Sequence, residues 1–434
     1  MPLNDAQKRR FTPWRRFVCG LLLLAIGWLP ITDGPTAAAA EETMQPPSLS
    51  SAGALLMDLD TGQILYEKQA DQPFYPASIT KILTAIVAIE NGDLDDVVTV
   101  SENAVRADGT RVYLVPGEQK TLRELLYAMM VNSGNDAAVA IAEHIAGSVE
   151  AFAQLMNQKA ADLGATHSHF VNPSGLHDDN HYTTAYDMAI IAQYAMRNPV
   201  FREIVQTKTM PWNGDEWQSQ LVNHNRLLWQ YEGATGIKNG YTSKAKQTFV
   251  ATAKKGETEL LAVCLQAPSQ AAMYNDLITL LNYGFEVYEA VPAVSKNDRF
   301  YPPDRSVEVA MRTSRDIRIL RPIYTSEGEE PPAVVTKVVM DDVQYPIHKG
   351  QQVGQLHISL GNKPIVQAPL YAAEAVVPPT PTKQEEFTAS GAPLWLAVAL
   401  AALAGLGWVV VYRQKRVLRR WKVPVPLDRK NTIH

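Results

Sequence analysis

A run of 21 uncharged residues near the C-terminus constrains this chain more than any other feature. The run APLWLAVALAALAGLGWVVVY, residues 392–412, is followed at once by a basic tail, residues 413–434. A helix of that length measures about 32 Å, which is enough to cross a bilayer. Lysine and arginine gather on the cytoplasmic side of such a helix. We therefore predict one C-terminal transmembrane helix in the cell membrane, a cytoplasmic tail, and everything upstream on the extracytoplasmic side.

The first 40 residues have the pattern of a cleaved signal peptide. Five basic residues precede the apolar run FVCGLLLLAIGWLPI, and an alanine stretch ends at Ala40. We predict cleavage near Ala40, because the apolar core is short and is followed by small residues. An uncleaved membrane anchor is the alternative. Cleavage leaves Cys264 as the only cysteine, so no internal disulfide can form.

The formal net charge of −5 hides a strong asymmetry along the chain. Residues 1–40 carry a charge of +3 and residues 413–434 carry +7, which leaves −15 for the segment between them. An acidic segment of this size repels the phosphate backbone. The sequence therefore predicts no nucleic acid among the partners.

The segment between the two ends is long enough for two domains. Residues 41–290 mix strand and helix patterns and predict a larger α/β (α+β) domain. Residues 291–376 show short alternating runs with proline breaks, which predict a small all-β domain that acts as a spacer or docking module. Residues 377–391 form a polar, proline-rich linker to the membrane.

Local patterns place several elements in the larger domain. GALLMDLDTGQILYEK and TFVATAKKGETELLAVCLQA each predict a β-hairpin around a glycine-containing turn. Residues 78–90 repeat apolar side chains at helical spacing and predict a buried helix that ends at Asn91 and Gly92. Thr121 and Glu124 form the pattern of a capping box at the start of another helix.

Ser78 and Lys81 begin the first of these helices, in the stretch YPASITKILTAIVAIENG. Residues three apart lie on one face of a helix, so an uncharged lysine there can take the serine proton. The lysine loses its charge near neutral pH only if it is desolvated or lies near a second cation. Alone the pair is weak evidence: Ser243 and Lys246 repeat its spacing, and for Ser78 by itself a helix N-cap beside an exposed lysine is the favoured explanation.

Two further stretches strengthen the hypothesis of a catalytic site. MVNSGNDAA places Ser133 and Asn135 at a break between two predicted helices, although plain turn chemistry accounts for the same residues. TGIKNGYTSK places Lys238 and Gly240 on a predicted edge strand. The glycine lets a substrate approach the strand, and Lys238 supplies the second cation that Lys81 requires.

With these residues the chain resembles the low-molecular-mass penicillin-binding proteins that act as D-alanyl-D-alanine carboxypeptidases. The three family motifs correspond to SITK, SGN and KNG, and the likeness extends to GEQKTLRELLYAMMVNSGNDAAVAIAEHIAGS and FVNPSGLHDDNHYTTAYDMA. The resemblance covers nearly all of residues 41–376. It implies a β-lactamase/transpeptidase-like domain with helices around an antiparallel sheet, and no metal or cofactor. It also implies a peptidoglycan stem peptide as substrate and β-lactams as covalent inhibitors.

The resemblance implies a role for each motif residue. Ser78 is the nucleophile, Lys81 its general base, and Ser133 a proton relay. Asn135 holds the substrate amide. Lys238, Asn239, Gly240 and Tyr241 bind the substrate, with the backbone N–H groups of Ser78 and Tyr241 as oxyanion donors. Two positions depart from the family pattern: Asn239 replaces a threonine, and Met273 lies where some relatives have an arginine.

Three alternatives remain open at this stage. His167, His169, His177 and His181, together with Asp178 and Asp179, are residue types that bind metals at short spacing. A β-lactamase shares the three motifs but requires a glutamate for deacylation, and we find no equivalent. A non-catalytic wall-binding protein could retain the fold despite the altered third motif.

Overall fold

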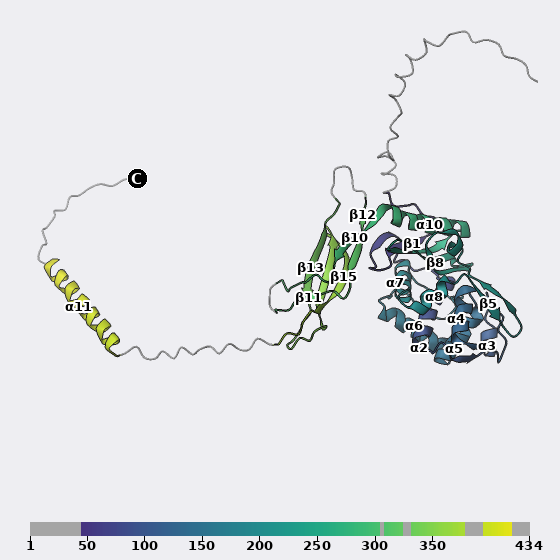
Figure 1. Ribbon diagram of the computed structural model, residues 1–434, viewed down its shortest axis with the longest axis horizontal. Coiled ribbons are helices and arrows are strands. Elements are labelled where there is room, and N and C mark those ends of the chain that lie inside the picture. Colours follow the sequence, from purple (N-terminus) through teal and green to yellow (C-terminus); the bar gives the residue numbers. More distant parts are fainter. Residues whose placement is uncertain (1–44, 304–307, 324–330, 378–393, 419–434) are drawn as a thin grey trace, which may run out of the picture. The chain divides into compact units, whose positions relative to one another are not determined.

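The computed structural model describes residues 45–303, 308–323, 331–377 and 394–418 (Figure 1). The predicted signal peptide, nearly all of the predicted linker and most of the basic tail lie outside these ranges. The chain divides into two units, residues 1–375 and 376–434, and each is described by itself.

The larger domain is built on a five-stranded antiparallel sheet in the order β2-β1-β9-β8-β7. Its strands are β1 (Gly53–Asp58), β2 (Ile64–Lys68), β7 (Ala234–Thr242), β8 (Lys246–Lys255) and β9 (Thr258–Ala267). The two predicted hairpins are confirmed as β1–β2 and β8–β9. Strand β7 lies at one edge, so a substrate can approach its free side.

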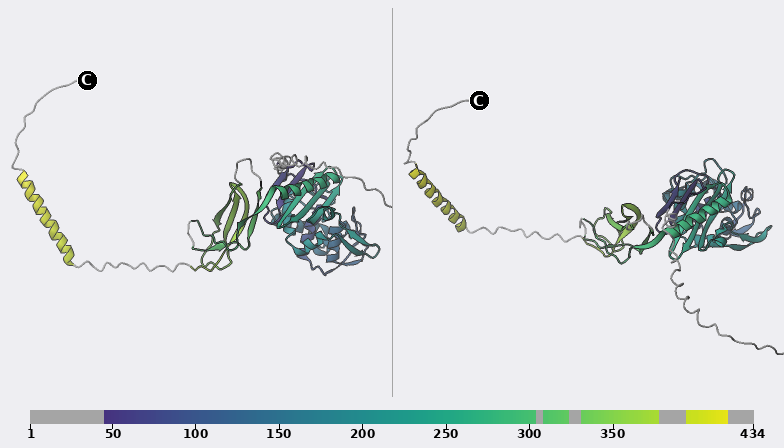
Figure 2. Two further views of the ribbon diagram at one scale, coloured as in Figure 1. Left: turned by 45° about the horizontal axis from the view of Figure 1, so that its top comes forward. Right: turned by 90° about the horizontal axis from the view of Figure 1, so that it is seen from above.

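Hydrophobic cores lie on both faces of the sheet. Alternate residues of β1 point to opposite faces: Leu55 joins the core beneath the helical layer, and Leu56 joins the core beneath α10 (Gln270–Val287). Figure 2 shows α10 lying across the strands. Met273 of α10 is fully buried in this second core and therefore acts as a packing residue.

A layer of helices covers the opposite face of the sheet. It contains α2 (Lys81–Asn91), α3 (Glu102–Val105), α4 (Leu122–Val131), α5 (Asn135–Ala146), α6 (Val149–Asp162), α7 (Ala185–Ala195) and α8 (Pro199–Gln206). The short helix α9 (Leu227–Gln230) instead contributes Leu227 to the core beneath α10. The predicted capping box is present at α4, where Thr121 and Glu124 bond reciprocally. Two short hairpins accompany the helices: β3 (Val97–Thr99) with β4 (Gln119–Thr121), and β5 (Thr209–Asn213) with β6 (Gln218–Val222).

The predicted helix at Ser78 begins differently from the expectation. Residues Ala77–Thr80 form a 3-10 turn, η1, and the α-helix starts at Lys81. Ala77 has a positive φ of 52°, and the Thr248 hydroxyl donates 2.7 Å to the Pro76 carbonyl. This bond fastens the turn to the sheet, so Ser78 lies at a constrained junction and is not a helix N-cap.

The small C-terminal domain is all-β, as predicted. Strand β10 (Tyr288–Val294) pairs with β12 (Ile317–Pro322), and a second sheet has the order β11-β15-β14-β13. Its strands are β11 (Met311–Arg312), β13 (Val334–Met340), β14 (Gln352–Leu360) and β15 (Lys363–Ala372). The Gln63 side chain exchanges two hydrogen bonds with the Leu320 backbone, at 2.6 and 2.8 Å.

The second unit contains the helix α11 (Leu394–Leu418), which covers most of the predicted transmembrane segment. Within residues 398–413 of this helix, every side chain is exposed. A search of the described parts of the chain finds no helix with the length and apolarity for a membrane crossing.

Candidate active site

The residues of the three motifs meet where η1, the junction between α4 and α5, and strand β7 come together. Ser78 lies in η1 and Lys81 is the first residue of α2. Asn135 is the first residue of α5, and Lys238 lies in β7. Segments separated by up to 160 residues of chain therefore supply one site.

The Lys81 amine lies at the centre of this site. Its side chain has no exposed surface, and Nζ lies 3.1 Å from Ser78 Oγ, 2.7 Å from Asn135 Oδ1 and 2.7 Å from the Ser174 carbonyl. The Ser174 carbonyl comes from the NPSGL stretch, for which the sequence predicted no catalytic role.

Burial and a second lysine together favour the uncharged form of Lys81. Desolvation lowers the pKa of Lys81 well below its ordinary value, and the nearby charge of Lys238 lowers it further. The charge of Asp136 acts on the pKa of Lys81 in the opposite direction. Desolvation also lowers the pKa of Lys238 to about 7, and Lys238 Nζ donates 2.9 Å to the Asn239 carbonyl.

Asn135 is held rigidly by its neighbours. Its backbone N–H donates 2.7 Å to the Thr110 carbonyl, and Nδ2 donates 2.5 Å to the Asp108 carbonyl. The adjacent Asp136 carboxylate accepts backbone N–H groups from Val112 and Leu114. These bonds place the 108–114 segment beside the site, and they leave one Asn135 N–H free to donate.

Ser133 occupies the turn between α4 and α5 with a positive φ of 64°, which is unusual for a residue other than glycine. It is 4% exposed. The hydrogen bonds that Lys81 and Lys238 donate go to other acceptors. Among the described residues no hydrogen bond joins the Ser133 side chain to either lysine, so its role as a proton relay stays a prediction.

Gly240 lets β7 approach the nucleophile closely. A Cβ atom at this position would lie 2.6 Å from the Ser78 backbone nitrogen and 2.8 Å from Thr248 Oγ1. Any larger residue would displace η1 from the strand. The Tyr241 side chain, by contrast, is 61% exposed, so only its backbone can take part in the predicted oxyanion site.

The competing patterns of the sequence do not form sites. Ser243, in the turn after β7, and Lys246, the first residue of β8, are both exposed, so burial does not desolvate that lysine. Within the described ranges, no group of three histidine, cysteine or acidic side chains is arranged to hold a metal ion. His181 is instead buried within hydrogen-bonding distance of Thr80 and Val171.

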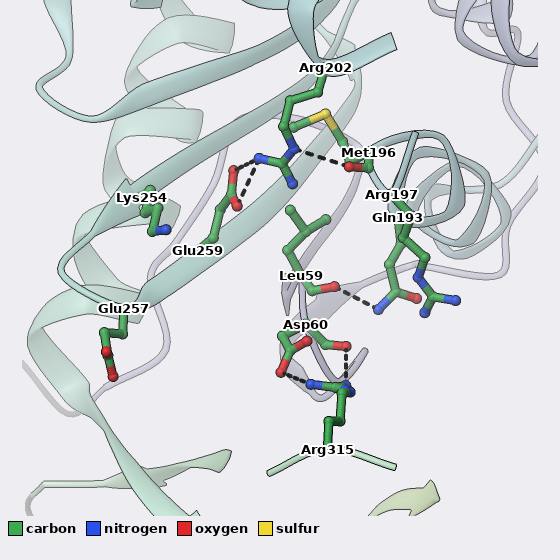
Figure 3. A pocket seen from close by; sticks show the side chains of 10 residues that line it. All are labelled: Leu59, Asp60, Gln193, Met196, Arg197, Arg202, Lys254, Glu257, Glu259 and Arg315. Atoms are coloured by element: carbon green, nitrogen blue, oxygen red, sulfur yellow. Dashed lines mark hydrogen bonds and ion pairs between the residues drawn. The ribbon is translucent and has the colours of Figure 1, made fainter. Parts of the chain in front are cut away.

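A separate cavity of about 580 Å³ contains none of the motif residues (Figure 3). Arg202, Glu259, Arg315 and Asp60 line it in two ion pairs, Arg202–Glu259 at 2.7 Å and Arg315–Asp60 at 2.6 Å. Arg197, Lys254 and Glu257 also line the cavity, but no serine does, so it lacks a nucleophile comparable to Ser78.

Comparisons with known proteins agree with this geometry. The model of the peptidase S11 family, D-alanyl-D-alanine carboxypeptidase, matches residues 40–269, and that of the penicillin-binding protein 5 C-terminal domain matches residues 288–378. The chain belongs to the S11 family of D-alanyl-D-alanine carboxypeptidases. The DacF carboxypeptidase of Bacillus subtilis is 34% identical over 82% of this chain and 93% of its own length.

Further relatives show the same S11 architecture. The DacC carboxypeptidase of Escherichia coli is 32% identical over 79% of this chain and 88% of its own. The solved structure of penicillin-binding protein 5 from Haemophilus influenzae is 29% identical, with a TM-score of 0.65, and covers 77% of this chain and 99% of its own. Coverages of 79% and 77% of this chain exceed the residues matched by the S11 model alone, so these two relatives also resemble the chain beyond the larger domain.

Proposed function

We propose that this S11 protein is a serine-type carboxypeptidase that removes the terminal D-alanine from peptidoglycan stem pentapeptides through an acyl-enzyme on Ser78. The family and its carboxypeptidase relatives support this activity. The single observation that carries the mechanism is the fully buried Lys81 amine, which lies 3.1 Å from the Ser78 hydroxyl.

The contacts of Lys81 fix the direction of its lone pair. An uncharged amine has two N–H donors and one lone pair. Asn135 Oδ1 and the Ser174 carbonyl can only accept from it, and both lie at 2.7 Å. They therefore take the two N–H groups, and the lone pair is directed at Ser78 Oγ. In this orientation Lys81 accepts the serine proton.

Acylation then follows the chemistry of an activated serine. Ser78 Oγ bonds to the carbonyl carbon of the terminal peptide link, and the proton passes to Lys81. The backbone N–H groups of Ser78 and Tyr241 stabilise the oxyanion. The proton then moves through Ser133 to the leaving nitrogen as the C–N bond breaks, and D-alanine departs. Water hydrolyses the ester in the reverse sense and regenerates Ser78.

We assign recognition of the substrate to Asn135 and to strand β7. The free N–H of Asn135 donates to the peptide amide carbonyl. Lys238 supports the uncharged state of Lys81 and attracts the terminal carboxylate, while the Asn239 amide replaces the family's hydroxyl as a hydrogen-bond donor. β-Lactams carry the same carboxylate and acyl groups, so they acylate Ser78 as covalent inhibitors.

We also propose attachment to the cell membrane through α11 with the catalytic domain outside the cytoplasm. The support is the uncharged run 392–412, the basic residues after it, and the signal-like pattern of residues 1–40. In this arrangement the small all-β domain, residues 291–376, is a spacer between residues 41–290 and the membrane.

Release of D-alanine from a muropeptide that ends in D-Ala-D-Ala tests the proposed activity. The full chain should release D-alanine and bind penicillin covalently, and Ser78→Ala should do neither while keeping its fold. Wild-type turnover by the purified Ser78→Ala variant would assign the nucleophile to another residue. Absence of both reactions in the wild type would favour a wall-binding protein, and rapid nitrocefin turnover would favour a β-lactamase.

A further inference from the structure

A buried histidine connects the nucleophile turn to the loop that supplies the Ser174 carbonyl, one of the two acceptors of Lys81. His181 is 1% exposed, and its Nε2 lies 2.9 Å from the hydroxyl oxygen of Thr80. Its Nδ1 accepts the backbone N–H of Val171 at 3.2 Å. The Phe170 ring packs edge-to-face against the imidazole, with ring centres 5.4 Å apart.

These contacts determine the tautomer of His181. A backbone N–H can only donate, so Nδ1 must be the acceptor and the ring proton must lie on Nε2. Nε2 then donates to Thr80 Oγ1. A second ring proton would oppose the N–H of Val171 directly, so the arrangement requires the neutral ring.

The surroundings of His181 keep it neutral. Burial lowers the pKa of His181 to about 4. Asp178 favours the charged form, whereas His169, Lys81 and His177 oppose it. At neutral pH the ring therefore keeps one donor and one acceptor.

The loop between Val171 and His181 is fastened to η1 and α2 at successive positions. The Ser174 carbonyl accepts from Lys81 Nζ, and the Pro173 carbonyl accepts from the Thr84 hydroxyl at 2.7 Å. Gly175 is pressed so closely on η1 that a Cβ atom would lie 1.8 Å from the Ala77 carbonyl oxygen. The Ser174 carbonyl therefore stays on Lys81 only while the loop remains fixed to η1.

We propose that His181 is a positioning residue for Lys81: by joining the Val171 N–H to the Thr80 hydroxyl, it holds the Ser174 carbonyl on the Lys81 amine. This inference rests on the proposed function. The carbonyl takes one of the two N–H groups of the amine and so directs the lone pair at Ser78. His181 touches neither the substrate nor the nucleophile, and it acts only through the loop.

Three variants test the positioning role. His181→Gln keeps an acceptor and a donor at a similar separation, so it should restore the bridge. His181→Leu removes both. His169→Leu is the matched control, because the His169 side chain is nearby but exposed, and its one side-chain hydrogen bond among the described residues is with the Asn180 carbonyl. The measurement is the rate constant of acylation by benzylpenicillin on the full chain between pH 5 and 9.

We expect His181→Leu to acylate about 10²-fold more slowly, the size of effect that a small misplacement of a catalytic group produces. The low-pH limb of its pH–rate profile, where the acylation rate constant falls with decreasing pH, should also move to higher pH. The reason is that water entering beside the loop relieves the desolvation of Lys81. Lys238, Asp136 and His224 also face Lys81, and none of the three is altered. The His181→Gln and His169→Leu variants should keep the wild-type rate and profile.

A fourth variant keeps the test valid if His181→Leu fails to fold. Thr80→Val removes the same hydrogen bond from the other side with little change of shape, and it should show the same slower acylation and shifted limb. Wild-type rates and profiles in Thr80→Val and His181→Leu would overturn the positioning role. Equal losses of acylation rate in His181→Gln and His181→Leu, with no shift in the low-pH limb of the pH–rate profile, would also overturn the positioning role, because they would indicate a packing role. If the wild type itself is not acylated, the proposed function fails instead.

Discussion

Lys81 and Lys238 are both buried, but they have different roles in this site. Lys81 Nζ lies within hydrogen-bonding distance of Ser78, Asn135 and Ser174, whereas the one hydrogen bond of the Lys238 amine among the described residues goes to the Asn239 carbonyl. A lysine without an acidic partner is rarely buried, since its charged form loses its hydration. The burial of these two lysine side chains is therefore unfavourable for folding stability, as expected where function requires perturbed pKa values.

Lys81→Met should slow acylation by benzylpenicillin by about 10²- to 10⁴-fold, the usual contribution of a general base. Methionine fills a similar volume without a lone pair. Lys246→Met is the control, because it removes the exposed lysine of the other Ser-x-x-Lys pair. Stopped-flow acylation measures both variants, and a loss of less than tenfold in Lys81→Met would contradict the assigned role.

Lys238 makes folding stability depend on pH in a predictable direction. Its pKa is about 7 in the folded chain and has its ordinary, higher value in the unfolded chain. Between pH 7 and pH 10 the unfolded state thus binds the additional proton, so the free energy of unfolding rises with pH. Below pH 7 both states are protonated, and the full cost of burying the charge is present.

The measurement for this effect is urea unfolding of the wild type and Lys238→Met at pH 7 and pH 10. The wild type should gain stability relative to the variant as the pH rises, because the variant lacks this group while the other titrations are shared. A difference that stays constant or falls over this range would show that Lys238 is not desolvated in the folded chain.

At the scale of elements, the contact between β7 and η1 is the part of the site most sensitive to size. Gly240→Ala should lower the acylation rate constant by about 10²-fold or more, because the added Cβ would press on the Ser78 nitrogen and displace an oxyanion donor. Gly256→Ala is the control: it lies in the turn between β8 and β9, with no atom within 4 Å of the added Cβ.

The control variant Gly256→Ala should lose only about 1 kcal/mol of folding stability, because residue 256 has a positive φ, and it should keep the wild-type acylation rate. Both rates can be measured with benzylpenicillin, and thermal unfolding reports the stability. Similar acylation rates in Gly240→Ala and the wild type would show that β7 does not constrain the nucleophile.

Local sequence patterns predicted the elements better than the junctions between them. The β1–β2 and β8–β9 hairpins and the capping box at Thr121 follow from turn residues and spacing within a few positions. The 3-10 turn at Ser78 could not be predicted in this way, because the bond from Thr248 to Pro76 that stabilises it joins residues 172 positions apart.

Prediction of the candidate site from the sequence has the same limit. Side chains with reactive groups, such as Lys81 and Lys238, are visible in the sequence, and the structure brings them together. The Ser174 carbonyl was missed because every residue has a backbone carbonyl, and only the loop fold shows which one faces the amine. The NPSGL stretch was a usable signal, since Asn172 accepts the N–H groups of Ser174 and Gly175 and shapes that loop.

At the scale of the whole molecule, the family matches end at residue 378, before the uncharged run and the basic tail. The predicted domain boundaries stay predictions, as does the membrane attachment. A chain that lacks residues 392–434 should be recovered in the soluble fraction, and the full chain should stay with membranes after alkaline carbonate extraction. Removal of residues 413–434 alone is the control and should leave the chain bound. Extraction of the full chain by carbonate would contradict a spanning helix.

Mass spectrometry of the full chain after reaction with benzylpenicillin, followed by peptide mapping, tests the central claim most directly. If an uncharged Lys81 activates the adjacent hydroxyl, one penicilloyl group should be found per chain, on the peptide that contains Ser78, and Lys81→Met should acquire it about 10²- to 10⁴-fold more slowly. An adduct on a different serine, or an undiminished rate of labelling in Lys81→Met, would contradict the account.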